Sequence, residues 1–167
     1  MDTFIIYHSK TGFSQRYAQW LAEDLRCETI PYQNRKSADL GKYGTVILIG
    51  GLYAGNMSGL GWLKKQPLSG KRTAAVAVGC SPIDWPGQAE SLEKLFGGTE
   101  IKGFYCQGGL AYDRMGAVDR AMMAALRATL KSKPEMKDML DGISRSFDGS
   151  KREYLAPVVR WAKGSAG

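Results

Sequence analysis

The sequence predicts a doubly wound α/β fold built on a five-stranded parallel sheet. Five short runs of apolar, strand-forming residues recur along the first two thirds of the chain, and segments with the apolar spacing of helices lie between them. The runs are nearly continuous in apolar residues, which is typical of strands buried on both faces. Strands that alternate with helices in this way favour a parallel sheet covered by helices on each side.

The first predicted unit is a strand, a polar loop and a helix. Residues 3–7 are β-formers, and residues 8–12 are polar and include a glycine. Apolar residues then recur along one face of a helix that is expected to end near Arg26; they are Phe13, Tyr17, Trp20, Leu21 and Leu25. This order places a polar loop between a buried strand and the start of a helix.

Four more strands are expected at residues 28–32, 46–49, 74–78 and 101–106, and two helices at 59–65 and from 86 or 87 to 96. The last three strands each end in a segment rich in glycine or serine: Gly50-Gly51, Gly79-Cys80-Ser81 and Gln107-Gly108-Gly109. Doubly wound sheets bind ligands beyond the carboxyl ends of their strands, where the strand order reverses. The glycine-rich strand ends therefore mark the expected binding edge.

Two longer helices are predicted after Tyr112, over residues 115–131 and 151–163. The first carries an apolar stripe on one side and a basic line on the other, formed by Met115, Val118, Met122, Leu126 and Thr129 or Leu130, and by Arg120, Arg127 and Lys131. We expect the stripe to be part of the core rather than a groove for a cofactor or partner. The sequence contains no linker or internal repeat, so residues 1–167 are expected to form one domain.

The composition is that of a globular chain, because 44% of its 167 residues are hydrophobic, 23% are charged and the formal net charge is +7. No apolar stretch approaches the roughly 18 residues that span a bilayer, and no basic segment precedes the first apolar run. Cys27, Cys80 and Cys106 are far apart and odd in number, which encodes no disulfide framework. We expect a cytoplasmic protein whose cysteines are small buried hydrophobic residues.

His8 is the only histidine in the sequence. This count excludes metal sites built from several histidines, and it excludes any Ser-His or Cys-His pair that does not use His8. No metal site is predicted, and no catalytic residue is assigned. Catalysis, if the protein performs any, must then depend on a cofactor, on carboxylates or on tyrosines.

The most informative segment is the hexapeptide from Ser9 to Ser14, Ser-Lys-Thr-Gly-Phe-Ser, between the first strand and the first helix. Backbone N–H groups at a helix N-terminus carry partial positive charge and lack internal partners, so they bind phosphate well. Three hydroxyls add donors, and Gly12 lets the backbone approach closely. The pattern differs from the motifs for ATP and for dinucleotides. The alternative is that Thr11 or Ser14 only caps the helix.

The hexapeptide resembles the FMN phosphate loop of flavodoxins, Ser/Thr-x-Thr-Gly-x-Thr/Ser after an N-terminal strand. The resemblance runs through residues 7–25 and extends over most of the chain. It implies the strand order 2-1-3-4-5 and an FMN cofactor whose isoalloxazine ring is flanked by residues 51–55 and 79–82, with Tyr53 stacked on it. The cofactor-binding residues so implied are Ser9, Lys10, Thr11, Gly12, Phe13, Ser14, Tyr53, Ala54, Gly55, Gly79, Cys80, Ser81, Gly108 and Gly109.

The C-terminal part is similar to a narrower group, the flavodoxin-type menaquinone-dependent protoporphyrinogen oxidases and their uncharacterised relatives. The similarity lies in residues 104–112, Phe-Tyr-Cys-Gln-Gly-Gly-Leu-Ala-Tyr, and in residues 118–123 of the following helix. These oxidases share the basic character of this chain, whereas electron-carrier flavodoxins are acidic. The similarity implies an FMN-dependent oxidoreductase that passes electrons from a reduced donor or porphyrin-like substrate to a quinone or a protein.

Two other functions stay open: an electron-shuttle flavodoxin, which with this charge would need acidic partners, and a flavodoxin-like binding module without flavin. Nucleic acid is not an expected partner, because the sequence has no recognition motif and no cluster of basic residues interleaved with aromatics. Residues 110–167 contain 11 basic and 7 acidic side chains, so 11 − 7 = +4 of the excess charge lies there. This charge favours peripheral association with an anionic membrane, where a quinone acceptor would be found.

Overall fold

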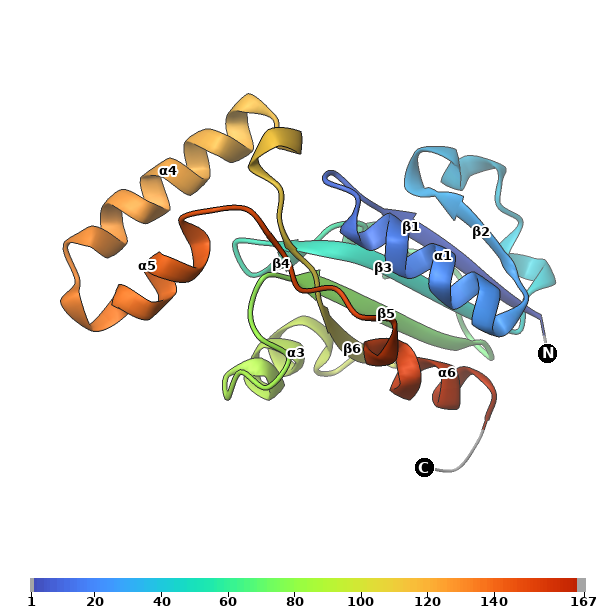
Figure 1. The fold of residues 1–167 in the computed structure, drawn as a ribbon. Helices are drawn as coiled ribbons and strands as arrows, with labels where there is room; N and C mark the ends of the chain where they lie inside the picture. The colour runs from blue at the N-terminus through green and yellow to red at the C-terminus, as the bar shows by residue number, and fades with distance from the viewer. Residues whose placement is uncertain (1, 165–167) are drawn as a thin grey trace.

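The structure is a computed structural model that describes residues 2–164. Its centre is a parallel sheet with the strand order β2-β1-β3-β5-β6, which confirms the predicted fold class and strand order (Figure 1). The strands are β1 (Thr3–His8), β2 (Glu28–Pro31), β3 (Thr45–Tyr53), β5 (Arg72–Gly79) and β6 (Lys102–Gln107). A short strand, β4 (Asn56–Met57), pairs antiparallel with the end of β3.

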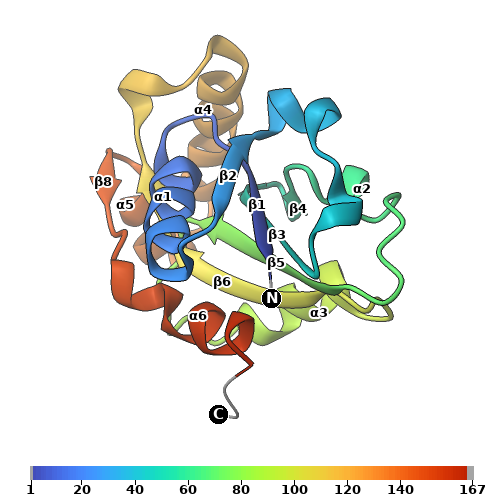
Figure 2. The ribbon, with the colours of Figure 1, turned by 90° about the vertical axis from the view of Figure 1, so that its right-hand side faces the viewer.

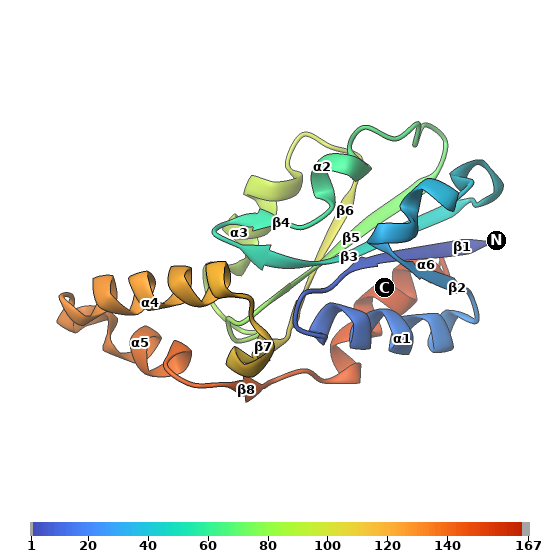
Figure 3. The same cartoon turned by 90° about the horizontal axis from the view of Figure 1, so that it is seen from above.

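Helices cover both faces of the sheet. Figures 2 and 3 show α1 (Phe13–Leu25) and α6 (Ala156–Ala162) on one side, and α2 (Leu60–Leu63) and α3 (Gln88–Phe96) on the other. Shorter 3₁₀ turns connect these elements, at Tyr32–Ser37, Leu40–Lys42, Tyr112–Arg114, Pro134–Met136 and Arg152–Leu155. The central strands are therefore shielded from water on both sides, as their apolar runs require.

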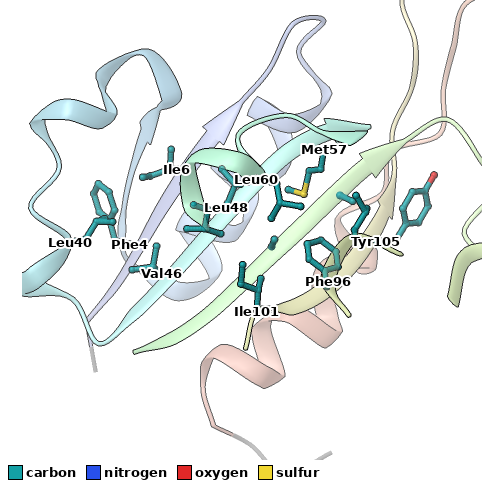
Figure 4. Close-up of a cluster of buried hydrophobic side chains, with 14 residues drawn as sticks. Phe4, Ile6, Leu40, Val46, Leu48, Met57, Leu60, Phe96, Ile101 and Tyr105 are labelled. Atoms are coloured by element: carbon teal, nitrogen blue, oxygen red, sulfur yellow. The ribbon is translucent and has the colours of Figure 1, made fainter. Parts of the chain in front are cut away.

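Neighbouring residues of each strand pack into different cores, because successive side chains of a strand point to opposite faces. Ile6 and Leu48 are fully buried against α2 and α3, in the core drawn in Figure 4. Ile5 and Ile47 are fully buried against α1 and α6. The two cores fix the register of the sheet, in which Ile6 of β1 pairs with Leu48 of β3.

Several element boundaries differ from the sequence prediction. The strand expected at 46–49 is longer, because Gly50 and Gly51 continue the pairing with the neighbouring strands. The helix expected over 151–163 is divided into a 3₁₀ turn and α6. Pro157 lies at the start of α6, where its fixed φ and missing N–H are tolerated. The helix expected at 59–65 is the single turn α2.

A helical hairpin extends beyond the carboxyl ends of the strands (Figures 1 and 3). It consists of α4 (Ala117–Lys131) and α5 (Lys137–Ile143). Both ends of this α4–α5 hairpin are held together by an antiparallel pair of short strands, β7 (Gly109–Leu110) and β8 (Phe147–Asp148). Strands β4, β7 and β8 and helix α5 were not expected from the sequence.

The prediction that the apolar stripe of α4 belongs to the core is wrong. Val118 is 73% exposed, Met122 is 49% exposed and Leu126 is 37% exposed, whereas Leu130 is buried. The physical reason is that α4 does not lie on the sheet: its buried contacts are made mainly with α5 and β7, where Leu130 packs with Ile143. Most of the stripe thus faces outward or toward the cavity described below.

Candidate functional site

A cavity of about 220 Å³ lies between the carboxyl ends of β1, β3 and β5 and the α4–α5 hairpin. The sheet contributes three loops to its lining, and the hairpin contributes an apolar wall. The residues of that wall are Leu110, Met115, Met123, Leu126, Met139 and Ile143, with Asp119 as the acidic member of the lining. This is the edge of the sheet at which the glycine-rich strand ends predict a ligand.

The loop after β1 leaves the start of α1 open toward an anion. Gly12 is the N-cap residue of α1 and has a φ of 101°, a left-handed conformation that favours glycine. The Ser9 hydroxyl accepts a hydrogen bond from the Gly12 N–H at 3.0 Å, which closes the turn. No side chain caps α1, and its first turn contains no acidic residue. The alternative that Thr11 or Ser14 serves as the helix cap is therefore wrong, and the N–H groups of the first turn remain available.

Two cations lie beside this loop. The Arg114 guanidinium lies next to Gly12, with Nη1 2.7 Å from the point that a Cβ on residue 12 would occupy. Lys10 Nζ is 3.4 Å from Asp119 Oδ2 on α4, in a partly exposed ion pair. The same ammonium is 4.4 Å from the centroid of the Tyr53 ring. The loop is thus positively charged and is connected to the α4–α5 hairpin.

The loop after β3 is a tight hairpin turn into β4. Ala54 and Gly55 have φ values of 48° and 78°, and two consecutive positive values are typical of two-residue hairpin turns. The Tyr53 ring folds back over Gly51, whose Cβ would lie 2.9 Å from Tyr53 Cε2. Burial raises the pKa of the Tyr53 phenol, and the nearby Asp119 carboxylate raises it further. Tyr53 is therefore a neutral aromatic side chain at the cavity.

The cysteines near the cavity are neutral thiols. Cys80 lines the cavity, and burial raises the pKa of its thiol. Cys106 is fully buried, and burial raises the pKa of its thiol to about 12. A thiol with a raised pKa is a poor nucleophile at neutral pH, so neither residue has the microenvironment of a reactive cysteine.

His8 contributes a buried nitrogen next to the cavity. Its Nδ1 is buried and has no hydrogen-bond partner in the part of the chain that the structure describes. Burial lowers the pKa of the imidazole, and the positive charges of Lys10 and Arg35 lower it further. The ring also packs edge-on against Tyr32 with its centroid 5.0 Å away. His8 is therefore an uncharged imidazole at neutral pH.

Ten of the fourteen cofactor-binding residues predicted from the sequence line this one cavity: Ser9, Lys10, Thr11, Phe13, Ser14, Tyr53, Ala54, Gly79, Cys80 and Gly109. The other four predicted residues lie outside the lining: Gly12, Gly55, Ser81 and Gly108. Gly12 and Gly55 form the turns of their loops. The Ser81 carbonyl accepts a hydrogen bond from Tyr105 at 2.7 Å. The Gly108 N–H donates to the Gly79 carbonyl at 2.7 Å, which joins the ends of β6 and β5.

The residues that the α4–α5 hairpin and its preceding turn bring to the site were not predicted. Asp119, Met115 and Met123 belong to the segment 115–131, whose apolar stripe is expected in the core, and Met139 belongs to α5, which was not expected. Arg114 lies in a 3₁₀ turn and carries no local signal for a place beside Gly12. The outward-facing stripe of α4 is the one feature of the sequence that could have indicated a second wall of the cavity.

No group of three or more His, Cys, Asp or Glu side chains within residues 2–164 could hold a metal ion. No helix in this range is long and apolar enough to cross a membrane.

Comparisons with known proteins identify similar structures and the family of this chain. Solved structures of similar proteins include proposed flavoproteins from Bacteroides eggerthii and Bacteroides uniformis and the Trp repressor binding protein from Bacillus subtilis. The first is 16% identical, covers 78% of this chain and 96% of its own, and has a TM-score of 0.48. The second is 16% identical, covers 64% of this chain and 90% of its own, and has a TM-score of 0.49. The third is 19% identical, covers 66% of this chain and 88% of its own, and has a TM-score of 0.46.

No curated protein matches this chain. The sequence model of the flavodoxin domain family matches residues 4–137, which is most of the chain and includes all five parallel strands and the loops at their carboxyl ends. The chain therefore belongs to the flavodoxin domain family.

Proposed function

We propose that the protein binds FMN in the cavity at the carboxyl ends of the strands and uses it for redox chemistry. The observation that carries this proposal is the uncapped first turn of α1, which opens beside two cations into the same cavity as Tyr53 and Gly79. Membership of the flavodoxin domain family supports the same cofactor. The residues present fit a phosphate attached to a planar, largely apolar ring system.

The chain's own residues would have distinct parts in this site. The N–H groups at the start of α1, with the hydroxyls of Ser9, Thr11 and Ser14, would hold the phosphate. Tyr53 and the backbone after β5 would orient the ring, and the hairpin wall would exclude water. Bound FMN supplies hydride and single-electron transfer, so the protein needs no nucleophile of its own.

A fluorescence titration of the flavin-free protein with FMN tests this proposal. We expect saturable quenching of FMN fluorescence, and weaker binding when two of the three loop hydroxyls are removed in the double variant Ser9→Ala/Thr11→Ala. Ser69→Ala is the matched control, because Ser69 lies in the exposed turn before β5, outside the cavity lining. Absence of quenching by the wild-type protein would show that the fold is a binding module without flavin.

For the substrate, we propose a reduced, porphyrin-like donor and a quinone acceptor, as in the flavodoxin-type protoporphyrinogen oxidases. The apolar wall formed by the α4–α5 hairpin supports this choice, because large planar substrates bind best in cavities lined by apolar side chains. Anaerobic incubation of the FMN-loaded protein with protoporphyrinogen and a menaquinone analogue should produce porphyrin. If no porphyrin forms but the loaded protein reduces an acidic electron-transfer protein, the electron-shuttle alternative is correct.

We also propose that the α4–α5 hairpin binds an anionic membrane surface. Val118, Met122 and Met139 are exposed apolar side chains of this hairpin, and Arg120 and Lys131 lie on the same helix as the first two. Exposed apolar side chains on one side of a helix and basic side chains on the other are typical of helices that lie in a lipid interface. Charge complementarity thus favours acidic lipid as the occupant of this face.

Sedimentation with vesicles tests the membrane proposal. Vesicles with anionic lipid should carry the protein into the pellet at low salt, and neutral vesicles should not. Val118→Glu should reduce this binding, whereas the control Ile83→Glu, at an exposed apolar residue outside the hairpin, should not. Equal binding to neutral vesicles, or equal loss in both variants, would contradict a role for the hairpin.

A further inference from the structure

Arg114 is a cation without an anionic partner, and its guanidinium lies beside the N-terminus of α1. Its guanidinium Nη1 lies 2.7 Å from the point that a Cβ on residue 12 would occupy. Its Cζ lies 5.5 Å from the centroid of the Phe13 ring. Arg114 forms no salt bridge with any acidic residue between positions 2 and 164. The guanidinium, which is exposed to solvent, therefore lies at the loop through its contacts with Gly12 and Phe13, with no carboxylate to hold it there.

The electrostatics of this arrangement favour a bound anion. The N-terminus of a helix carries partial positive charge, and α1 has no acidic residue in its first turn to offset it. Lys10 adds a second cation on the same loop, although this one is paired with Asp119. A guanidinium beside an uncapped helix N-terminus brings like charges together, and a dianion next to both would remove the repulsion.

The chemistry of arginine identifies the anion. A guanidinium presents a planar set of N–H donors that matches the oxygens of a phosphate, and such charge-assisted hydrogen bonds are stronger than neutral ones. Within the phosphate loop the backbone N–H groups and hydroxyls are neutral donors, and the one cation, Lys10, is paired with Asp119. Arg114 lies 114 − 12 = 102 residues further along the chain than Gly12, in the turn that precedes α4.

We propose that Arg114 is a phosphate-binding residue of the FMN site, and that it makes the protein select flavins that carry a terminal phosphate. This inference rests on the proposed function and adds to it a specificity-determining residue outside the phosphate loop. Gly12 has a second role on this view, because any side chain at residue 12 would displace the guanidinium. The phosphate site is thus completed by the segment that leads into the α4–α5 hairpin.

The test compares two ligands that differ by the phosphate. FMN and riboflavin are titrated into the flavin-free wild-type protein and into Arg114→Gln, and dissociation constants are read from fluorescence quenching. We expect the variant to bind FMN about tenfold more weakly, as loss of a hydrogen bond to a charged group predicts, and to bind riboflavin unchanged. The affinity of the wild-type protein for FMN should fall as salt rises, and Arg114→Gln should show a smaller fall.

Two further variants separate the phosphate contact from other effects. Arg145→Gln removes the same charge from an exposed arginine after α5 that, unlike Arg114, has no atom within 4 Å of the Cβ position of residue 12, and it should leave both dissociation constants unchanged. Arg114→Lys keeps the charge without the planar donors, and its FMN affinity should lie between those of the wild type and Arg114→Gln. Thermal melting by circular dichroism verifies that each variant is folded.

The outcomes are distinguishable. Equal FMN affinity in Arg114→Gln and the wild type would overturn this inference alone, and so would an equal loss for FMN and riboflavin, which would mark Arg114 as a packing residue. A wild-type protein that binds neither flavin would overturn the proposed function together with the inference. A selective loss of FMN affinity in Arg114→Gln, with Arg145→Gln unaffected, establishes the proposed contact.

Discussion

At the scale of single residues, Ala54 has a backbone conformation that residues other than glycine rarely adopt. Its φ of 48° lies in the left-handed region, directly before Gly55 with a φ of 78°. The left-handed region costs an L-residue about 1–2 kcal/mol, so this turn stores strain at the edge of the cavity. The short β3–β4 pairing on either side of the turn holds Ala54 in place.

Substitution of Ala54 should reveal this strain. Ala54→Val should lower the free energy of unfolding by about 1–2 kcal/mol, because a β-branched side chain tolerates positive φ least. Ala54→Gly should be at least as stable as the wild type, since glycine adopts this conformation without a steric penalty. Urea unfolding of the three proteins measures the difference, and a valine variant as stable as the wild type would show that the turn is unstrained.

At the scale of elements, Tyr112 connects the two helices of the α4–α5 hairpin. Its hydroxyl donates to the Ile143 carbonyl at the end of α5 and accepts from Arg127 Nη1 of α4 at 2.7 Å. Its backbone carbonyl accepts from Arg120 Nε at 2.9 Å. One side chain therefore connects both helices of the hairpin, and two of the three arginine and lysine residues of the basic line on α4 are fixed rather than free.

Removal of the Tyr112 hydroxyl should loosen the hairpin without affecting the sheet. Tyr112→Phe leaves the Ile143 carbonyl and the Arg127 guanidinium without this partner, which should cost about 1–2 kcal/mol in the stability of the hairpin. Hydrogen exchange should become faster at amides of α4 and α5 and stay unchanged in β3 and β5. Tyr43→Phe is the control, because the hydroxyl of Tyr43 bonds Glu28 far from the hairpin. Equal acceleration in both variants would contradict a local role for Tyr112.

The elements that the sequence predicts well are those whose burial follows from a local pattern. The unit from β1 to α1 is an example, because a continuous apolar run and a helical stripe each indicate which face meets the sheet. The stripe on α4 has the same spacing, but spacing alone does not tell whether a sheet, a ligand or water covers it. Two-residue strands such as β7 depend on tertiary pairing and leave no periodic pattern.

The same distinction applies to the candidate site. The loops at 9–14 and 79–80 were predictable because each follows a recognisable strand, and the ends of parallel strands meet at one edge, whereas residues 53–54 were expected through the resemblance to flavodoxins. Arg114 and Asp119 reach this edge through the placement of the α4–α5 hairpin, which no local pattern encodes. Sequence patterns thus predict the half of the site that the sheet supplies.

At the scale of the whole molecule, several cysteine and tyrosine side chains keep their protons at pH values well above their ordinary pKa. Burial raises the pKa of Cys106 from 9.0 to about 12 and that of Cys27 from 9.0 to about 11. Burial likewise raises the pKa of Tyr17 and Tyr105. In the unfolded chain these groups would titrate near their ordinary values, so between those values and the raised ones the folded state binds more protons.

The stability of the protein should therefore fall as the pH rises above about 9. Each fully buried group that remains neutral only in the folded state contributes a fall of about 1.4 kcal/mol per pH unit in its window. Urea unfolding at pH 7.5, 9 and 10.5 measures this dependence. Cys106→Ala should show a shallower fall than the wild type, and a stability that is constant over this range would contradict the prediction.

The pairing of β7 with β8 has a consequence for how this fold can vary. The chain leaves the body of the molecule at Leu110 and returns at Phe147, and these two residues are paired partners. Everything between them is topologically an insert, so its length and composition can change while the sheet and the loops at its edge keep their sequence. A change in this insert can therefore alter one wall of the cavity while the loops of the sheet that form the other wall stay the same.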